Sequence, residues 1–156
     1  MQIKRREFIQ SAGGTGIFML LVGAGLIKPG ELRAETWNKA AFETTTLPEL
    51  MKALGGDEPA VHADIAIVAP EIAENGAVVP ISVSSGLPNV TMIAILIEKN
   101  PNLLAASFNI PAGTLADVQA RVKMAQTSNV FALIKTGGKF VYAAKEIKIT
   151  LGGCGG

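Results

Sequence analysis

The stretch DVQARVKMAQ, residues 117–126, alternates polar and apolar side chains with a period of two. This period places one face of a β-strand in a core and the other face in water. The apolar face carries Val118, Ala120, Val122 and Met124. The polar face carries Asp117, Gln119, Arg121 and Lys123. We therefore predict a strand that is half-buried along the whole stretch, as in an antiparallel sheet with one solvated face.

Seven other stretches are expected to form strands around this one. They occupy residues 61–69, 78–84, 90–98, 104–110, 130–136, 139–144 and 146–151. The connections between them contain Gly, Pro and Asn, and Gly137-Gly138 is typical of a two-residue hairpin turn. Short strands at this spacing predict an all-β fold, an immunoglobulin-like antiparallel β-sandwich.

A short N-terminal helical segment is expected ahead of the strands. The sequence TLPE at residues 46–49 has the spacing of a capping box, and the glycine pair at residues 55–56 would end the helix. Trp37, Ala41 and Phe42 indicate another short helical turn before it.

The first 34 residues have the features of an export signal. Paired arginines, Arg5 and Arg6, are followed by Phe8, and the apolar stretch of residues 12–27 is shorter than the roughly 20 residues of a membrane span. This pattern predicts a twin-arginine signal peptide on residues 1–34, cleaved after Ala34, and a periplasmic protein. An ordinary secretory signal that contains Arg-Arg, or an uncleaved N-terminal anchor, is the alternative.

Composition and the one histidine argue against several classes of function. Beyond residue 34, nine Lys and Arg stand against eleven Asp and Glu, so no basic face for nucleic acid is indicated. One cysteine and one histidine cannot complete a zinc, iron or haem site, and no nucleophile motif accompanies His62. We interpret His62 as a structural or surface residue and Asp57-Glu58 as part of a solvated loop, and we expect no bound cofactor or metal.

The only cysteine, Cys154, lies in the tail LGGCGG, residues 151–156. Its glycine neighbours are Gly152, Gly153, Gly155 and Gly156. In an oxidising compartment a lone cysteine is buried, paired with another chain or chemically employed, and a slim glycine backbone cannot bury it. No Lys, Arg or His lies within five residues to activate the thiol. We therefore predict a flexible carrier arm on residues 152–156, attached to a sandwich domain of residues 35–151, with partner enzymes supplying the catalysis.

The chain resembles the SoxY family, the sulfur-carrier subunits of the periplasmic thiosulfate-oxidising Sox system. The resemblance rests on the twin-arginine signal of residues 4–10, on APEIAENGAVVP at 69–80, on EKNPNLLAASFNIP at 98–111, on RVKMAQTSNV at 121–130 and on the terminal LGGCGG. It implies an immunoglobulin-like sandwich and a heterodimer with a similarly folded SoxZ-like subunit.

The resemblance also implies a role for Cys154 as the point of covalent sulfur attachment. A c-type cytochrome enzyme would join thiosulfate oxidatively to this sulfur, and a hydrolase would then release sulfate. A molybdenum-haem dehydrogenase, where present, would oxidise the sulfane sulfur that remains. The carrier itself would need no cofactor.

Two other classes of protein remain open from the residues alone. A ubiquitin-like carrier would convert the terminal carboxylate of Gly156 into a thiocarboxylate, and a structural protein would use Cys154 in a permanent intermolecular disulfide. The partner-facing surface and the final sulfur product are also open, with Arg121, Lys123 and Gln126 as candidates for that surface.

Overall fold

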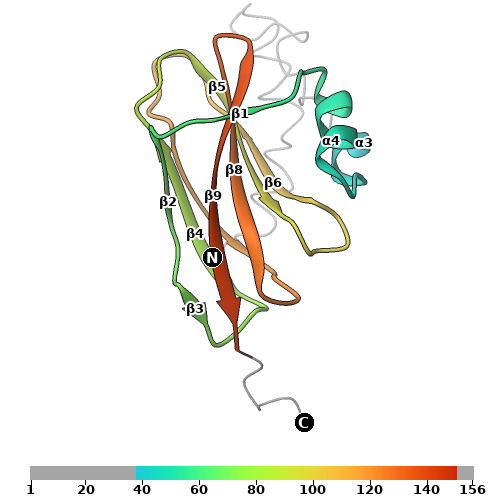
Figure 1. The fold of residues 1–156 in the computed structure, drawn as a ribbon. Coiled ribbons are helices and arrows are strands. Elements are labelled where there is room, and N and C mark those ends of the chain that lie inside the picture. Colours follow the sequence, from blue (N-terminus) through green and yellow to red (C-terminus); the bar gives the residue numbers. More distant parts are fainter. Residues whose placement is uncertain (1–37, 151–156) are drawn as a thin grey trace, which may run out of the picture. The chain divides into compact units, whose positions relative to one another are not determined.

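The computed structural model describes residues 38–150, which fold into an immunoglobulin-like β-sandwich with two short helices at one side (Figure 1). The predicted signal peptide, Trp37 and the predicted arm lie outside the described residues. No helix among residues 38–150 is long and apolar enough to span a membrane.

Two sheets face each other across the core. The first sheet has the strand order β1 (Ala60–Val61), β9 (Lys139–Ile149), β8 (Ser128–Thr136), β5 (Val90–Ile97) and β6 (Leu104–Asn109), and β3 (Ile72–Ala73) also pairs with β9. The second sheet has the order β2 (Ile65–Val68), β4 (Val79–Ser85) and β7 (Asp117–Val122). Neighbours are antiparallel, except that β1 and β3 run parallel to β9.

Strand β5 is buried on both faces, which explains its nearly unbroken apolar sequence VTMIAILI. One face packs between the sheets, and its members are Ile93, Ile95 and Ile97. The other face packs under the helices, and its members are Met92, Ala94 and Leu96. The first sheet is thus the central layer of the domain.

The helices α3 (Lys39–Phe42) and α4 (Leu47–Leu54) cover the outer face of the first sheet. The predicted capping box is confirmed, because the Thr46 hydroxyl accepts from the Glu49 amide and the Glu49 carboxylate accepts from the Thr46 amide. Gly55, with a φ of 67°, ends α4 in the left-handed conformation that favours glycine. Leu50 and Met51 are the residues of α4 buried against the sheet.

The predicted strand over residues 61–69 is wrong as one element, because the chain changes sheet within it. Val61 pairs with Tyr142 in the first sheet, whereas Ile65 pairs with Ser85 in the second. A turn between them is closed by His62, whose Nδ1 accepts from the Asp64 amide at 3.2 Å. At this turn the chain leaves the first sheet and enters the second.

Three other strand predictions need correction. The strand predicted over residues 117–126 ends at Val122, and the two strands predicted over 139–144 and 146–151 form the single strand β9. The two-residue strand β3 was not predicted. The hairpin turn between β8 and β9 is confirmed, and positive φ angles of 53° at Gly137 and 82° at Gly138 match its glycine pair.

Candidate functional site

The residues predicted for sulfur attachment, for the flexible arm and for export all lie outside the described part of the chain. They are Cys154, the arm glycines Gly152, Gly153, Gly155 and Gly156, and the signal residues Arg5, Arg6 and Phe8. The structure does describe the end of the sandwich that leads to the predicted arm. We call Ile149 and Thr150, the last two described residues, the arm root.

Strand β9 anchors the arm root in the first sheet. It pairs with β8 from Lys139 to Ile147, and Ile147 is fully buried in the core between the sheets. The last residues of β9 extend beyond this pairing. Hydrogen bonds from two other segments hold them, one on each side.

On one side, β3 lies against the end of β9 (Figure 1). The Lys148 amide donates to the Glu71 carbonyl at 2.9 Å, and the Thr150 amide donates to the Ala73 carbonyl at 3.1 Å. Ala73 is buried, which fixes the segment to the core. The parallel pairing therefore extends to the last described residue.

On the other side, the turn after β7 closes over the end of β9. The Ile149 amide donates to Thr127 Oγ1 at 3.0 Å, and the buried Met124 donates its amide to the Gly76 carbonyl at 2.7 Å. A Cβ atom on Gly76 would lie 2.4 Å from the Met124 carbonyl oxygen and 3.1 Å from Ile149 Cγ2. Only glycine fits at this junction without a shift of the backbone.

A side chain from a third segment secures the same turn. Asn100 donates from Nδ2 to the Lys123 carbonyl at 2.7 Å and accepts at Oδ1 from the Ala125 amide at 3.2 Å. This bridge explains why the alternation of residues 117–126 does not continue as a strand. The backbone of residues 123–125 bonds to Asn100 and Gly76, outside the sheet.

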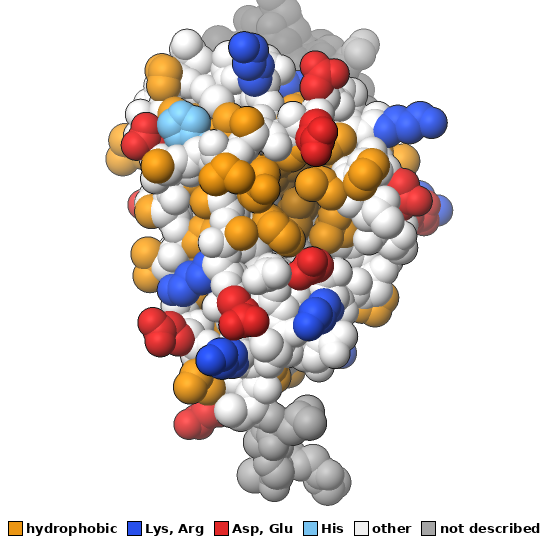
Figure 2. Space-filling view, in the orientation of Figure 1, with side chains coloured by type: hydrophobic (Ala, Val, Ile, Leu, Met, Phe, Trp, Pro, Cys, Tyr) orange, Lys and Arg blue, Asp and Glu red, His pale blue; other side chains and the backbone are white. Residues whose placement is uncertain are grey.

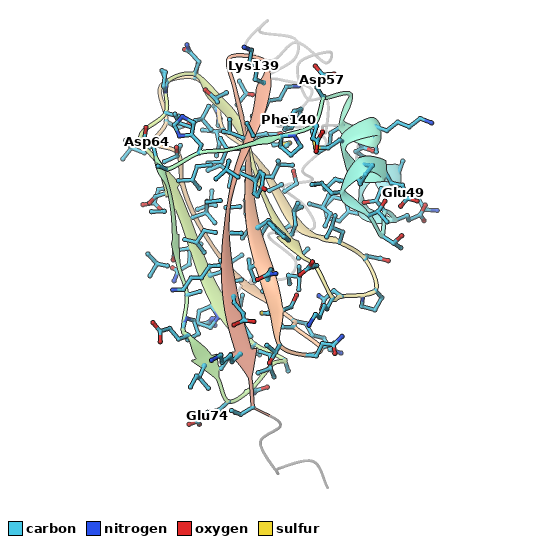
Figure 3. All side chains as sticks on the ribbon, in the orientation of Figure 1. Glu49, Asp57, Asp64, Glu74, Lys139 and Phe140 are labelled. Carbon is cyan, nitrogen blue, oxygen red and sulfur yellow. The ribbon has the colours of Figure 1, made fainter. Side chains whose placement is uncertain are left out.

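The arm root therefore has a fixed position and direction at one end of the sandwich. The sequence pattern does not identify the residues that fix the arm root, namely Ala73, Gly76, Asn100 and Thr127. The composition of Glu74-Asn75-Gly76 indicates no more than a turn, and β3 is too short for a periodic signal. Glu74 lies beside the end of β9, whereas Glu49 lies at the helical side of the domain (Figure 3).

The other residues singled out in the sequence are not brought together with the arm root. His62 is half-buried, and its amide donates to the Tyr142 carbonyl at 2.9 Å, as expected of a structural residue. Asp57 and Glu58 are exposed. Within residues 38–150, no group of three or more His, Cys, Asp or Glu residues is arranged to hold a metal ion.

Two hollows on the domain surface have distinct linings. Arg121 and Lys123 line a groove of about 400 Å³ between β6 and β7, and Gln126 is exposed but does not line it. A second hollow of about 460 Å³ lies between α4 and the segment before β1, and Leu47, Met51 and Pro59 contribute to its walls. Figure 2 shows hydrophobic side chains gathered on the face that carries α4, β1 and β9.

Comparison with known proteins gives consistent matches. The family model described as "Sulfur oxidation protein SoxY" matches residues 50–154. Among solved structures, the sulfur carrier protein SoxY from Chlorobium limicola f thiosulfatophilum is 37% identical, with a TM-score of 0.61, over 67% of this chain and 96% of that chain. No curated protein sequence matches.

More distant solved structures share the fold alone. Two forms of the superoxide reductase (neelaredoxin) from Ignicoccus hospitalis have a TM-score of 0.50, with 23% and 21% identity. Each match covers 80% of this chain and 99% of the other. Identity this low extends the likeness to the β-sandwich and no further.

Proposed function

The chain belongs to the SoxY family of sulfur oxidation proteins, and from this membership we propose that it is a periplasmic carrier that holds thiosulfate-derived sulfur on Cys154. Membership of the family supports a sulfur-carrier role. The proposal adds the substrate, the attachment site and the compartment.

One observation carries the proposal, namely that the family match runs through residue 154 and so includes the cysteine position. The geometry of the arm root supports it. Hydrogen bonds to Ala73 and Thr127 hold the last described residues, so the sandwich acts as a fixed base for whatever follows. A substrate tethered beyond such a base meets each enzyme by protein docking instead of free diffusion.

The first chemical step that we propose joins thiosulfate to the arm. The Cys154 sulfur forms an S–S bond with the sulfane sulfur of thiosulfate, and the thiol proton is released. The two electrons leave one at a time through the haem of a c-type cytochrome enzyme to an electron acceptor, which is the oxidant. The sequence places no activating cation within five residues of Cys154, so the partner must also stabilise the thiolate.

The second step releases sulfate by hydrolysis of the bond between the sulfane and sulfonate sulfurs. Water supplies the fourth sulfate oxygen, and a persulfide remains on Cys154. Where a molybdenum-haem dehydrogenase is present, it oxidises this sulfane sulfur to a sulfonate with three oxygens from water, and the six electrons leave one at a time through its haem to an electron acceptor. Hydrolysis then releases a second sulfate and regenerates the thiol.

We further propose that the chain acts in a heterodimer with a SoxZ-like subunit and reaches the periplasm by twin-arginine export. Because this export route moves folded proteins, the subunit could travel already bound. A persistent S–S adduct also fits an oxidising compartment, where cytoplasmic thiol reductants do not cleave it.

The proposal is tested by reconstituting the first step. Mature chain with its SoxZ-like subunit is incubated with thiosulfate and an electron acceptor, with and without the c-type cytochrome enzyme, and intact mass is recorded. We expect a reductant-sensitive mass increase only with the enzyme, and none in Cys154→Ser. An adduct that persists in Cys154→Ser, or that forms at the same rate without the enzyme, contradicts the proposal.

A further inference from the structure

We propose that the exposed apolar side chains of Ile72 and Val78, beside the arm root, form the surface on which a sulfur-transferring enzyme docks while its active site holds Cys154. The inference rests on the proposed carrier function and goes beyond it, because it assigns the docking surface to named residues of the sandwich. We call Ile72 and Val78 the docking pair.

The docking pair belongs to a small set of exposed apolar side chains. Five large hydrophobic side chains in the described part of the chain are exposed, namely Val61, Val68, Ile72, Val78 and Leu115. Ile72 is 57% exposed and Val78 is 52% exposed, although each is next to a buried residue, Ala73 or Val79. Single exposed apolar side chains are common on protein surfaces, so the assignment depends on where Ile72 and Val78 lie, which is beside the arm root.

The backbone around the docking pair ties it to the arm root. Ile72 pairs with Lys148 in the sheet, and its neighbour Ala73 pairs with Ile149. Val78 follows Gly76 by two residues, and Gly76 touches Met124 and lies near Ile149. Because these contacts leave the segment little freedom, the backbone that carries the docking pair is fixed relative to the arm root, and β3 lies beside the end of β9 (Figure 1).

The length of the chain beyond the arm root limits where a partner can sit. Cys154 is four residues beyond Thr150, so its Cα is at most about 14 Å away at full extension. If the reacting group of the enzyme lies at the bottom of a channel, most of the length between Thr150 and Cys154 lies inside that channel. The rim of the channel must then rest against the arm root and the residues around it.

The charges around the docking pair favour a transient contact with several enzymes. Exposed Glu71 and Glu74 are offset by exposed Lys123 and Lys148, so the surface has no strong field of one sign. Electrostatic steering therefore contributes little, and apolar contact supplies the affinity. A small, mainly apolar contact is also readily released, as a carrier that moves between enzymes requires.

The occupant is the enzyme and neither a second copy of this chain nor the SoxZ-like subunit. A subunit that remained bound at the docking pair would cover the surface beside the arm root, against which the rim of the channel must rest. The stable partner must therefore bind elsewhere on the sandwich.

The test uses charge-neutral substitutions that remove apolar contact. The double variant Ile72→Ser/Val78→Ser, each single variant, and Leu115→Ser are prepared as the complex with the SoxZ-like subunit. Leu115 is the matched control, because it is 87% exposed and precedes β7, where Asp117 pairs with Ser84 at the other end of the sandwich. The readout is kcat/KM for enzyme-catalysed attachment of thiosulfate to Cys154, followed by mass.

We expect kcat/KM to fall about tenfold in the double variant and to change less than twofold in Leu115→Ser. The rate of alkylation of Cys154 by iodoacetamide should not change, because that reagent needs no docking. Thermal melts check that each variant is folded, and Val78→Ser, which lies outside any strand, keeps the test valid if Ile72→Ser is unstable.

Three results would overturn the assignment in distinguishable ways. Equal kcat/KM values in the double variant and wild type would refute the docking surface while leaving the carrier function intact. Loss of the SoxZ-like subunit from the double variant on gel filtration would assign the surface to that subunit instead. No adduct in wild type would refute the proposed function, and the docking surface with it.

Discussion

The close packing around Gly76 predicts that a side chain at this position would destabilise the domain. Its carbonyl accepts from the Met124 amide at 2.7 Å, and a Cβ atom built on it would lie 2.4 Å from the Met124 carbonyl oxygen. The clashing atom belongs to the backbone, so no side-chain rotation can relieve the contact. We predict that Gly76→Ala destabilises the domain and loosens the arm root.

The magnitude follows from two contributions. Moving the Met124 oxygen away to a normal contact distance is an overpacking strain of about 1–3 kcal/mol. The same shift weakens the hydrogen bond between Gly76 and Met124, which contributes about 1 kcal/mol. Together the free energy of unfolding should fall by about 2–4 kcal/mol, which is a fall in melting temperature of about 8–16 °C for a domain of this size.

The measurement is thermal unfolding of the mature chain by circular dichroism, with Gly86→Ala as the matched control. A Cβ on Gly86 meets nothing within 4 Å, and its φ is not in the left-handed region. This control should melt within about 4 °C of wild type, with a small gain from the lower entropy of the unfolded chain. If the two variants melt at the same temperature, the close approach of Gly76 to Met124 is refuted.

Three further predictions concern the helix cap and the arm root. Thr46→Ala should lower the free energy of unfolding by about 1 kcal/mol because α4 loses its cap, whereas Thr46→Ser should restore most of it in the same melts. Hydrogen bonds from the Thr45 amide and the Thr46 hydroxyl lower the pKa of Glu49, so its stabilising effect is present above the ordinary carboxyl pKa and is lost as pH falls through the lowered value. The difference in melting temperature between wild type and Glu49→Gln should therefore shrink between about pH 6 and pH 3, and a constant difference would contradict this cause. Thr127→Val removes the acceptor of the Ile149 amide at 3.0 Å, so hydrogen exchange of that amide should accelerate about fivefold or more, and unchanged exchange would show that the bond does not hold the arm root.

The sandwich could be predicted because most of its strands carry a local signal. The alternation at the start of β7 and the apolar run of β5 arise from burial on one face and on both faces, respectively. The cap of α4 and the Gly137-Gly138 turn depend on residues close in sequence, which a linear pattern contains.

The predictions that failed depend on contacts between distant residues. Met124 continues the apolar alternation of β7 and is buried in the core, but its amide bonds to the carbonyl of Gly76, 48 positions earlier, instead of to a neighbouring strand. The break between β1 and β2 exists because the two halves pair with different sheets. Neither fact is encoded in the spacing of nearby side chains.

The residues of the candidate site also fall into those with a local sequence signal and those that only the fold brings together. Cys154 and its glycines could be singled out because their chemistry is local to the tail. The residues that fix the arm root could not be singled out, since Thr127, Ala73 and Gly76 come together only when β3 and the turn after β7 meet β9. The docking pair also emerges only from the fold, because its exposure is a tertiary property.

The central claim is that sulfur is carried covalently on Cys154, and intact mass spectrometry of the mature protein from thiosulfate-grown cells tests it most directly. Spectra are recorded before and after reductant, for wild type and for Cys154→Ser. The account predicts a reducible adduct of sulfane or sulfonate sulfur on wild type, mapped to Cys154 by fragmentation, and an unmodified Cys154→Ser chain. A thiosulfate-dependent modification that survives Cys154→Ser, or one mapped to the terminal carboxylate of Gly156, would contradict it.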